Sequence, residues 1–361
     1  MVLVIAVGLQ VPLLWALGRL TSHLGLIVAG AGLLTAAFIS SFLGPRSLWG
    51  APSRARLYLT MWPFFLWWTV AMLFAVLLPF ALLATAVLPI ASRDALSVAL
   101  GLAVVGALIS LRQRPRVRAH EVFVSGLPAP FDGYRIAQIS DLHVGPFADA
   151  RRVAGWVTAT NDQGPDLVVA TGDFIASGST YVPVVAGAFQ KLSARDGAYA
   201  CMGNHDYFTD GEALAAAVER AGVPVLRNRG VNIQRDGAVL HLAGVDDTWT
   251  RRANVELALA QRPPGAPVVL LAHDPTLFPQ AARAGVALTL SGHTHGGQLG
   301  VPFASKRWNL ARVFTGFTTG LYTAGASTLY VNRGLGTTGP PIRIGVPPGI
   351  AVLTLRRAPI G

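Results

Sequence analysis

Residues 135–145 read RIAQISDLHVG, a short apolar run that ends at once in Asp141 and His143. Four later apolar runs end in the same kinds of residue. They are followed by Thr171-Gly172-Asp173, Gly203-Asn204-His205-Asp206, His273-Asp274 and Gly292-His293-Thr294-His295-Gly296-Gly297. Because the carboxyl ends of strands form the ligand crevice of open α/β sheets, we expect these five clusters to converge.

From about residue 118 onward, short β-rich runs alternate with amphipathic stretches, which is typical of an α/β domain. The predicted strands are Arg135–Ile139, Asp166–Ala170, Gly197–Met202, Val239–Ala243, Pro267–Ala272, Ala287–Leu290, Thr328–Asn332 and Ile350–Leu355. The predicted helices are Arg151–Thr160, Val182–Ala194, Gly211–Ala221 and Asn254–Gln261. We therefore expect one domain over residues 119–361.

The side chains in the five clusters are of the kinds that bind divalent metal ions. Imidazole nitrogens with carboxylate and amide oxygens suit Mn, Fe or Zn, and the lack of thiolates excludes a structural zinc site. Seven candidate ligands are too many for one ion. A carboxylate can bridge two ions ~3.5–4 Å apart, and such a pair polarises a phosphoryl group and generates hydroxide from water.

Each cluster also has a simpler interpretation when taken alone. Asn204-His205-Asp206 is equally consistent with a helix N-cap beside an exposed histidine. His293-x-His295 would place both rings on one face of an extended segment, a pattern that is common by chance. All five clusters together, each at a strand end, favour a metal site. The other histidines lack this setting and are interpreted as structural: His23, His120 and His241.

The composition points to a membrane protein. The chain has 361 residues, 52% apolar and 13% charged, which excludes disorder and a fibrous or disulfide-rich fold. The single cysteine, Cys201, cannot form an intramolecular disulfide. The cysteine content therefore does not decide between an oxidising and a reducing compartment, although it favours the cytoplasm. Four uncharged stretches approach or exceed the ~20 residues of a membrane-spanning helix. They are Val2–Gly18, Leu24–Leu43, Leu57–Ile90 and Ala95–Leu111.

The arginines predict the orientation of these spans. Residues 1–118 hold nine Arg, no Lys and one acid, while the whole chain has a net charge of +11. These Arg punctuate apolar runs, which favours membrane edges over nucleic acid. With four spans, the 44–56 loop and the 112–118 segment carry seven Arg on one side, against Arg19 and Arg93 on the other, so both termini are predicted to be cytoplasmic.

Two alternatives concern the spans themselves. Two short spans hinged near Pro79 would place the Arg clusters on opposite sides, so Leu57–Ile90 is predicted to be one span. A transporter would need ionisable groups at mid-membrane depth, and the spans contain no charged residue there, which favours an anchor.

The ordered motifs resemble those of the calcineurin-like metallophosphoesterase superfamily: D-x-H, G-D, G-N-H-[DE], H and G-H-x-H, all present here. More narrowly, the chain is similar to the branch that includes membrane-anchored bacterial phosphoesterases and the animal transmembrane protein with a metallophosphoesterase domain. The resemblance covers residues 119–361, including Phe131-Asp132-Gly133-Tyr134-Arg135 and Asn332-Arg333-Gly334-Leu335-Gly336. It implies a β-sandwich flanked by helices, preceded here by an N-terminal bundle of about four transmembrane helices.

The resemblance also implies a role for each residue. Asp141, His143 and His295 would hold one divalent ion, Asn204, His273 and His293 the other, and Asp173 would bridge the two. A hydroxide bridging the ions would attack phosphorus in line. His205 would face the scissile phosphate as an acid or transition-state stabiliser, with Asp206 orienting its ring.

Two further features are predicted separately. Arg333 is either a bidentate clamp on the substrate phosphate or a structural arginine that bonds loop carbonyls. The pair Asp246-Asp247 is interpreted as a loop device rather than another metal site.

The complete hypothesis is a membrane anchor (1–111), a basic juxtamembrane linker (112–118) and a two-metal phosphoesterase domain (119–361) in the bacterial cell membrane, with the catalytic domain cytoplasmic. Anchoring raises the effective concentration near membrane-embedded substrates, so a lipid-linked phosphodiester or pyrophosphate is the expected substrate, such as a nucleotide-linked lipid precursor or a phospholipid. The resemblance suggests UDP-diacylglucosamine as one example, because some members of the branch are similar to the pyrophosphatase that cleaves it. No nucleic-acid partner is expected, and no oligomeric state is predicted. The alternative is a non-catalytic metal-binding membrane scaffold.

Overall fold

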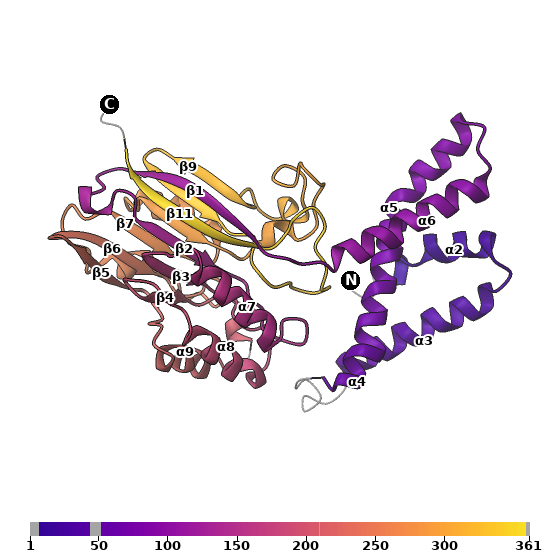
Figure 1. Ribbon diagram of the computed structural model, residues 1–361, viewed down its shortest axis with the longest axis horizontal. Coiled ribbons are helices and arrows are strands. Elements are labelled where there is room, and N and C mark those ends of the chain that lie inside the picture. Colours follow the sequence, from indigo (N-terminus) through magenta and orange to yellow (C-terminus); the bar gives the residue numbers. More distant parts are fainter. Residues whose placement is uncertain (1–6, 44–51, 209, 359–361) are drawn as a thin grey trace. The chain divides into compact units, whose positions relative to one another are not determined.

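The computed structural model describes residues 7–43, 52–208 and 210–358. The chain divides into two compact units, and each is described by itself (Figure 1). The first unit comprises Met1–Gln113 with Pro340–Ile342, and the second comprises Arg114–Gly339 with Arg343–Gly361.

The first unit is helical. Its elements are α2 (Val11–Leu20), α3 (Leu24–Leu43), α4 (Arg54–Arg56), the π-helical η2 (Leu57–Met61), α5 (Trp62–Val87) and α6 (Ser92–Ser110). Within the described residues, two helices are long and apolar enough to cross a membrane, Arg54–Val87 and Ser92–Ser110. The apolar helical segments Val11–Leu20 and Leu24–Ser40 are 10–17 residues long, and the predicted span Val2–Gly18 lies partly outside the described residues.

The structure confirms the single-helix interpretation of the third apolar stretch. Helix runs without a break from Arg54 to Val87, and Pro79 lies inside it. On α6, alanines four residues apart form a buried stripe that packs against Ala71 and Phe74 of α5. Such small residues on one helix face let two apolar helices approach closely.

The second unit contains two mixed β-sheets that pack face to face, as the predicted sandwich requires (Figure 1). The first sheet has the order β1 (Arg116–Val124), β11 (Gly349–Arg357), β2 (Arg135–Ile139), β3 (Leu167–Thr171), β4 (Ala198–Cys201). The second has the order β5 (Arg229–Arg235), β6 (Ala238–Gly244), β7 (Val268–Leu271), β8 (Leu288–Ser291), β10 (Ser327–Val331), β9 (Gly320–Ala324). Strands β2, β3 and β4 are parallel to one another, as are β6, β7, β8 and β10.

The burial pattern of the strands follows from their two-residue period. Leu167 and Val169 of β3 face the core between the sheets, while Val168 and Ala170 face the helices that cover the first sheet. Those helices are α7 (Ala150–Asn161), α8 (Val182–Phe189) and α9 (Gly211–Arg220), and α10 (Val255–Leu259) and α11 (Phe278–Arg283) cover the second sheet. Both faces of the central strands are therefore buried, which explains why they read as continuous apolar runs.

The sequence missed three strands, and each lies at the edge of a sheet: β1, β5 and β9. Edge strands carry polar and charged residues because one side is not covered by another strand. In β1 only Val122 and Val124 are buried, and the strand begins at Arg116, so it overlaps the segment predicted to be the linker 112–118.

Candidate metal centre

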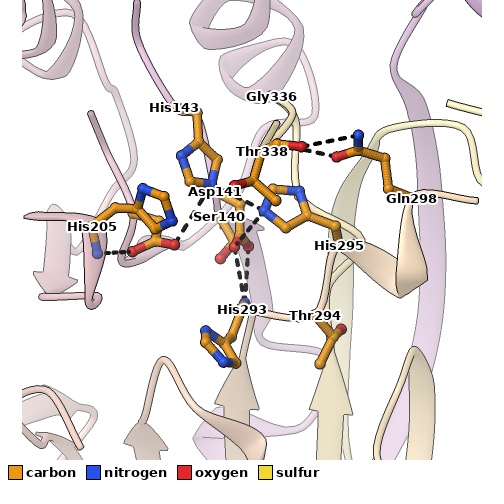
Figure 2. Close-up of polar contacts among 12 residues, drawn as sticks. Ser140, Asp141, His143, His205, His293, Thr294, His295, Gln298, Gly336 and Thr338 are labelled. Carbon is orange, nitrogen blue, oxygen red and sulfur yellow. Dashed lines mark hydrogen bonds and ion pairs between the residues drawn. The ribbon is translucent and has the colours of Figure 1, made fainter. Parts of the chain in front are cut away.

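The five polar clusters follow β2, β3, β4, β7 and β8, and the sandwich brings them together as predicted. Figure 2 shows the residues that follow β2, β4 and β8. Among the described residues, the three groups of His, Cys, Asp or Glu that could hold a metal ion all fall in this cluster. They are Asp141 with His143 and His295, Asp173 with His273 and His293, and His143 with Asp173 and His205.

One half of the cluster forms around Asp141. The Nε2 atoms of His143 and His295 lie 3.0 Å apart, and His295 Nε2 lies 3.5 Å from an Asp141 carboxylate oxygen. Asp141 is fully buried, and its carboxylate accepts the backbone N–H of His293 at 2.9 Å.

The other half forms around Asp173. His273 Nε2 lies 3.3 Å from an Asp173 carboxylate oxygen and 3.3 Å from His293 Nδ1. The same Asp173 oxygen lies 3.6 Å from His143 Nε2. Asp173 therefore stands between the two pairs of imidazoles, which is where a bridging carboxylate must be.

Asn204 completes the set of candidate ligands. It occupies the N-cap position of the short helix η5 (His205–Tyr207), but its side chain makes no capping hydrogen bond. Its Oδ1 atom is buried and has no hydrogen-bond partner among the described residues. A buried polar atom without a partner is unfavourable, so the ligand interpretation of Asn204 fits better than the N-cap interpretation.

These distances and donors fit divalent ions. Two nitrogens that each lie about 2.1 Å from one ion are separated by about 3.0–3.4 Å at octahedral or tetrahedral angles. The His143–His295 and His273–His293 pairs, at 3.0 and 3.3 Å, match this separation. The donor set of imidazole, carboxylate and amide suits Mn, Fe or Zn.

A neighbouring backbone group orients one ligand histidine. The Nδ1 atom of His273 donates to the carbonyl oxygen of Thr171 at 2.7 Å, which turns Nε2 towards Asp173. Such outer contacts set the tautomer and ring orientation of metal-binding histidines.

The electrostatics of the site favour a bound cation. Burial lowers the pKa of His143 to about 3 and lowers that of His295 well below its usual value, so both rings are neutral lone-pair donors. Burial raises the pKa of Asp141 to about 6. Burial by itself would lower the pKa of His273, yet the Asp173 carboxylate raises it to about 10. Asp173 therefore attracts positive charge strongly.

The backbone at the ligands is unusual. Five of them have positive φ angles: Asp141 (50°), His143 (45°), Asp173 (55°), His293 (71°) and His295 (52°). This left-handed conformation costs a non-glycine residue about 1–2 kcal/mol, and it clusters at functional sites. The prediction that His293-x-His295 is extended is therefore wrong: the chain turns at both histidines, because that turn directs them towards different acids.

Two glycines allow the loops to come this close. A Cβ atom on Gly292 would collide with the side chains of Ser140 and Asp141, and one on Gly203 would collide with the Asp173 carboxylate. Glycine is required at both positions because another strand-end loop fills the space of its side chain.

The Asp206 carboxylate contacts backbone groups in the structure, whereas its predicted partner is the ring of His205. Its buried carboxylate accepts the backbone N–H groups of Asp173, Phe174 and Gly203 at 2.9, 2.7 and 2.9 Å. It therefore supports the loop that carries Asp173. The ring of His205 is held instead by the Ala176 carbonyl, 3.0 Å from Nδ1.

The sequence missed three residues near the centre. Arg343 is buried, and its guanidinium donates to the carbonyl oxygens of Gly336 at 2.6 Å and His295 at 3.3 Å, so it fixes the His295 loop. Two exposed aromatic rings lie beside site histidines: Phe208, 4.4 Å from His205, and Trp249, 5.7 Å from His293. Neither an isolated arginine nor a loop aromatic carries a motif that could have revealed it.

Other predicted residues lie elsewhere. Arg333 donates from Nε to Thr319 Oγ1 at 3.1 Å, and no contact between it and the ligand side chains is seen in the described structure. Asp246 accepts from Tyr207 and Arg227, and Asp247 accepts from the Thr250 backbone, as a loop device would.

The histidines interpreted as structural lie apart from the ligand groups. His120 contacts the Tyr330 ring, and His241 Nδ1 lies 2.8 Å from Asn232 Oδ1. The exposed His23 directly precedes α3.

The sandwich and its cluster of imidazoles and carboxylates define the class of metal-dependent hydrolases. The family model for calcineurin-like phosphoesterases matches residues 134–297. YkuE of Bacillus subtilis (strain 168), an uncharacterized metallophosphoesterase, is 34% identical over 66% of this chain and 84% of its own length. The chain belongs to the calcineurin-like metallophosphoesterase family and is a metal-dependent phosphoesterase.

Further relatives widen the comparison. A transmembrane protein with metallophosphoesterase domain from Danio rerio is 34% identical over 71% of this chain, which spans 61% of that protein's length. Among solved structures, a dimetal phosphatase from Danio rerio aligns with 56% of this chain and 88% of its own, at 10% identity and a TM-score of 0.37.

Proposed function

We propose that this phosphoesterase is anchored in a membrane and uses two divalent ions to hydrolyse a phosphodiester or pyrophosphate bond in a lipid-linked substrate. The proposal rests on the four histidine rings around Asp173. His143 and His295 lie on one side of this carboxylate, and His273 and His293 lie on the other. One ion cannot occupy both pairs, whereas two ions sharing Asp173 can.

In this proposal Asp141, His143 and His295 hold one ion, and Asn204, His273 and His293 hold the other. When bound, two such ions polarise the phosphoryl group and lower the pKa of water enough to supply a nucleophile near neutral pH. Asp206 keeps Asp173 in place through the backbone, and Arg343 does the same for His295.

His205 has a different role from the ligands. Its backbone N–H donates to Asp173 Oδ1 at 2.9 Å, and its Nδ1 atom contacts the Ala176 carbonyl, which leaves Nε2 free. Its ring lies 4.6 Å from that of His143, so it borders the ligand cluster. A protonated His205 would stabilise charge on the scissile phosphate and deliver a proton to the leaving oxygen.

The membrane part of the proposal rests on the two long apolar helices and on a relative that is named a transmembrane protein. We infer that α2 and α3 also belong to the anchor, which makes four spans. The arginines of the 44–56 loop and the 112–118 segment then lie on the cytoplasmic side of a bacterial cell membrane, together with the catalytic domain. A C-terminal reporter that is active only outside the cell would contradict this orientation.

The reaction is tested with the detergent-purified full chain, stripped of metal and re-supplied with Mn, Fe, Zn or Mg. We expect metal-dependent hydrolysis of bis-p-nitrophenyl phosphate. His205→Ala should lower kcat about 10²–10⁴-fold while two ions per chain remain bound, because it removes an acid and no ligand. His273→Ala should lose bound metal as well. No turnover with any metal despite two bound ions would instead support a metal-binding scaffold.

The substrate class is tested with a matched pair. A nucleotide-linked lipid precursor in mixed micelles is compared with the soluble nucleotide sugar that shares its pyrophosphate. Preferential cleavage of the lipid form is expected, because the anchor holds the enzyme at the surface where that substrate resides. Cleavage of the soluble form alone would refute the lipid-linked substrate.

A further inference from the structure

The second unit exposes an unusual number of large apolar side chains in one segment. Within residues 301–314, which we call the apolar loop, six of them are at least half exposed: Val301, Phe303, Trp308, Leu310, Val313 and Phe314. Phe303 is fully exposed, and Phe314 is 82% exposed. Six exposed large apolar side chains within one short segment indicate an interaction site, since water disfavours exposed apolar surface.

Hydrogen bonds within the apolar loop fix its conformation. Its two arms are joined by the Val301 N–H, which donates to the Trp308 carbonyl at 2.9 Å. The Asn309 side chain accepts the Arg312 N–H at 3.1 Å and donates to the Ser305 carbonyl at 2.7 Å. Several backbone polar groups of the loop are thus paired within the chain while its apolar side chains are exposed, which suits a segment that enters an apolar medium.

The charge of this region is entirely positive. Lys306, Arg307 and Arg312 are exposed on the apolar loop, and Asp274 is the last acidic residue of the chain. Exposed Trp and Phe beside Lys and Arg are typical of segments that lie in the interface of an anionic membrane. A second protein would need complementary acids, whereas anionic headgroups supply the negative charge and the acyl region below them accepts the rings.

Within the second unit, the base of the apolar loop lies near the segment by which the chain enters this unit. Just before the loop, the Gly300 N–H donates a hydrogen bond to the Ile344 carbonyl at 2.8 Å. At the start of β1, the Arg116 N–H donates to the Pro348 carbonyl at 2.9 Å. Ile344 and Pro348 are four residues apart, so at most about 14 Å of chain separates the two places. Only five residues separate Arg116 from Ser110, the end of the apolar helix α6.

We propose that the apolar loop inserts into the interface between the headgroups and the acyl chains of an anionic bilayer and so holds the catalytic domain against the lipid surface. This inference rests on the proposed membrane anchor. Five residues separate His295 from the start of the loop, and one of them, Gly297, packs so tightly on Asn309 that no larger residue fits. Docking of the loop therefore brings the metal centre to lipid-linked phosphate groups.

The test uses the single cysteine of the chain. Cys201 is fully buried, so it does not compete for a thiol-reactive label. Phe314→Cys is labelled with an environment-sensitive fluorophore, and the full chain is placed in phosphatidylglycerol nanodiscs that contain nitroxide-labelled lipid. The matched control is Leu257→Cys on α10, where the side chain is 56% exposed and belongs to a different element from the loop.

We expect the label at position 314 to be quenched at least threefold more than the label at 257. Replacing phosphatidylglycerol by phosphatidylcholine, or introducing Arg307→Gln, should reduce the difference. Equal quenching at both positions would overturn the proposal. Shielding of position 314 that depends on protein concentration and not on nitroxide lipid would also overturn it, because that result indicates a second copy.

Hydrolysis of bis-p-nitrophenyl phosphate is measured in the same samples. Hydrolysis without quenching at position 314 would refute docking and leave the proposed reaction intact. Quenching without hydrolysis would support docking and refute the reaction.

Discussion

In most proteins polar side chains are exposed and apolar side chains are buried, and the metal centre and the apolar loop depart from this rule in opposite ways. The metal centre buries carboxylates, imidazoles and an amide oxygen, whereas the apolar loop exposes Phe303, Trp308 and Phe314. Both arrangements are unfavourable in isolation. The comparison teaches that each region is organised around a component from outside the chain: cations in the first case and, as we propose, lipid in the second.

The largest effect should come from the residue that both halves of the metal centre share. Asp173→Asn removes the bridging charge, so we expect loss of bound metal and a fall in kcat of more than about 10³-fold, beyond the 10–100-fold typical of outer contacts. Turnover and metal content are measured together. His23→Ala, at an exposed histidine, is the control and should change neither.

A smaller effect is expected at the residue that supports Asp173. Asp206→Asn places an NH₂ group against backbone N–H donors, so about 1–3 kcal/mol of stability should be lost and metal affinity should fall about 10–100-fold. Thermal unfolding and metal titration measure these effects. Asp210→Asn, at an exposed N-cap that accepts one N–H from Ala213, is the matched control. If both variants behave alike, the role given to Asp206 is wrong.

Each of the two regions exposes a tryptophan, Trp249 beside the metal centre and Trp308 on the apolar loop, so these residues test whether the regions differ in function. Trp249→Ala should raise the KM for bis-p-nitrophenyl phosphate about threefold to tenfold, since an aromatic contact contributes about 0.5–1.5 kcal/mol, with little change in kcat. Trp308→Ala, at an equally exposed tryptophan of the apolar loop, should leave this KM unchanged. Equal increases would show that the two exposed tryptophans do not differ in function.

The smallest effect is expected for soluble substrate when the apolar loop is altered. Phe314→Ser should change kcat and KM for bis-p-nitrophenyl phosphate by less than twofold, because the residue is exposed and outside the ligand groups. The same variant should lower turnover of a lipid-linked substrate in a bilayer several-fold. A parallel loss on both substrates would mean that the apolar loop supports the metal centre rather than docking.

Strand prediction succeeded where residues are buried on both faces and failed at three of the four sheet edges, with β4 the edge strand that was predicted. The core strands β2, β3, β7 and β8 read as apolar runs because helices cover one face and the other sheet covers the second. β1 carries charged residues at exposed positions, so no periodicity in the sequence separates it from a basic linker.

The sequence alone determined the chemistry of this protein, because metal binding requires particular side-chain types and because strands place the residues that follow them at one end of a sheet. The candidate ligands after β2, β3, β4, β7 and β8 were named on that basis. Only the tertiary structure decided which of them face one another, that Asp206 supports the Asp173 loop, and that Phe208 and Trp249 border the site. These are distances between segments remote in sequence, set by the packing of two sheets, and local residue patterns do not encode them.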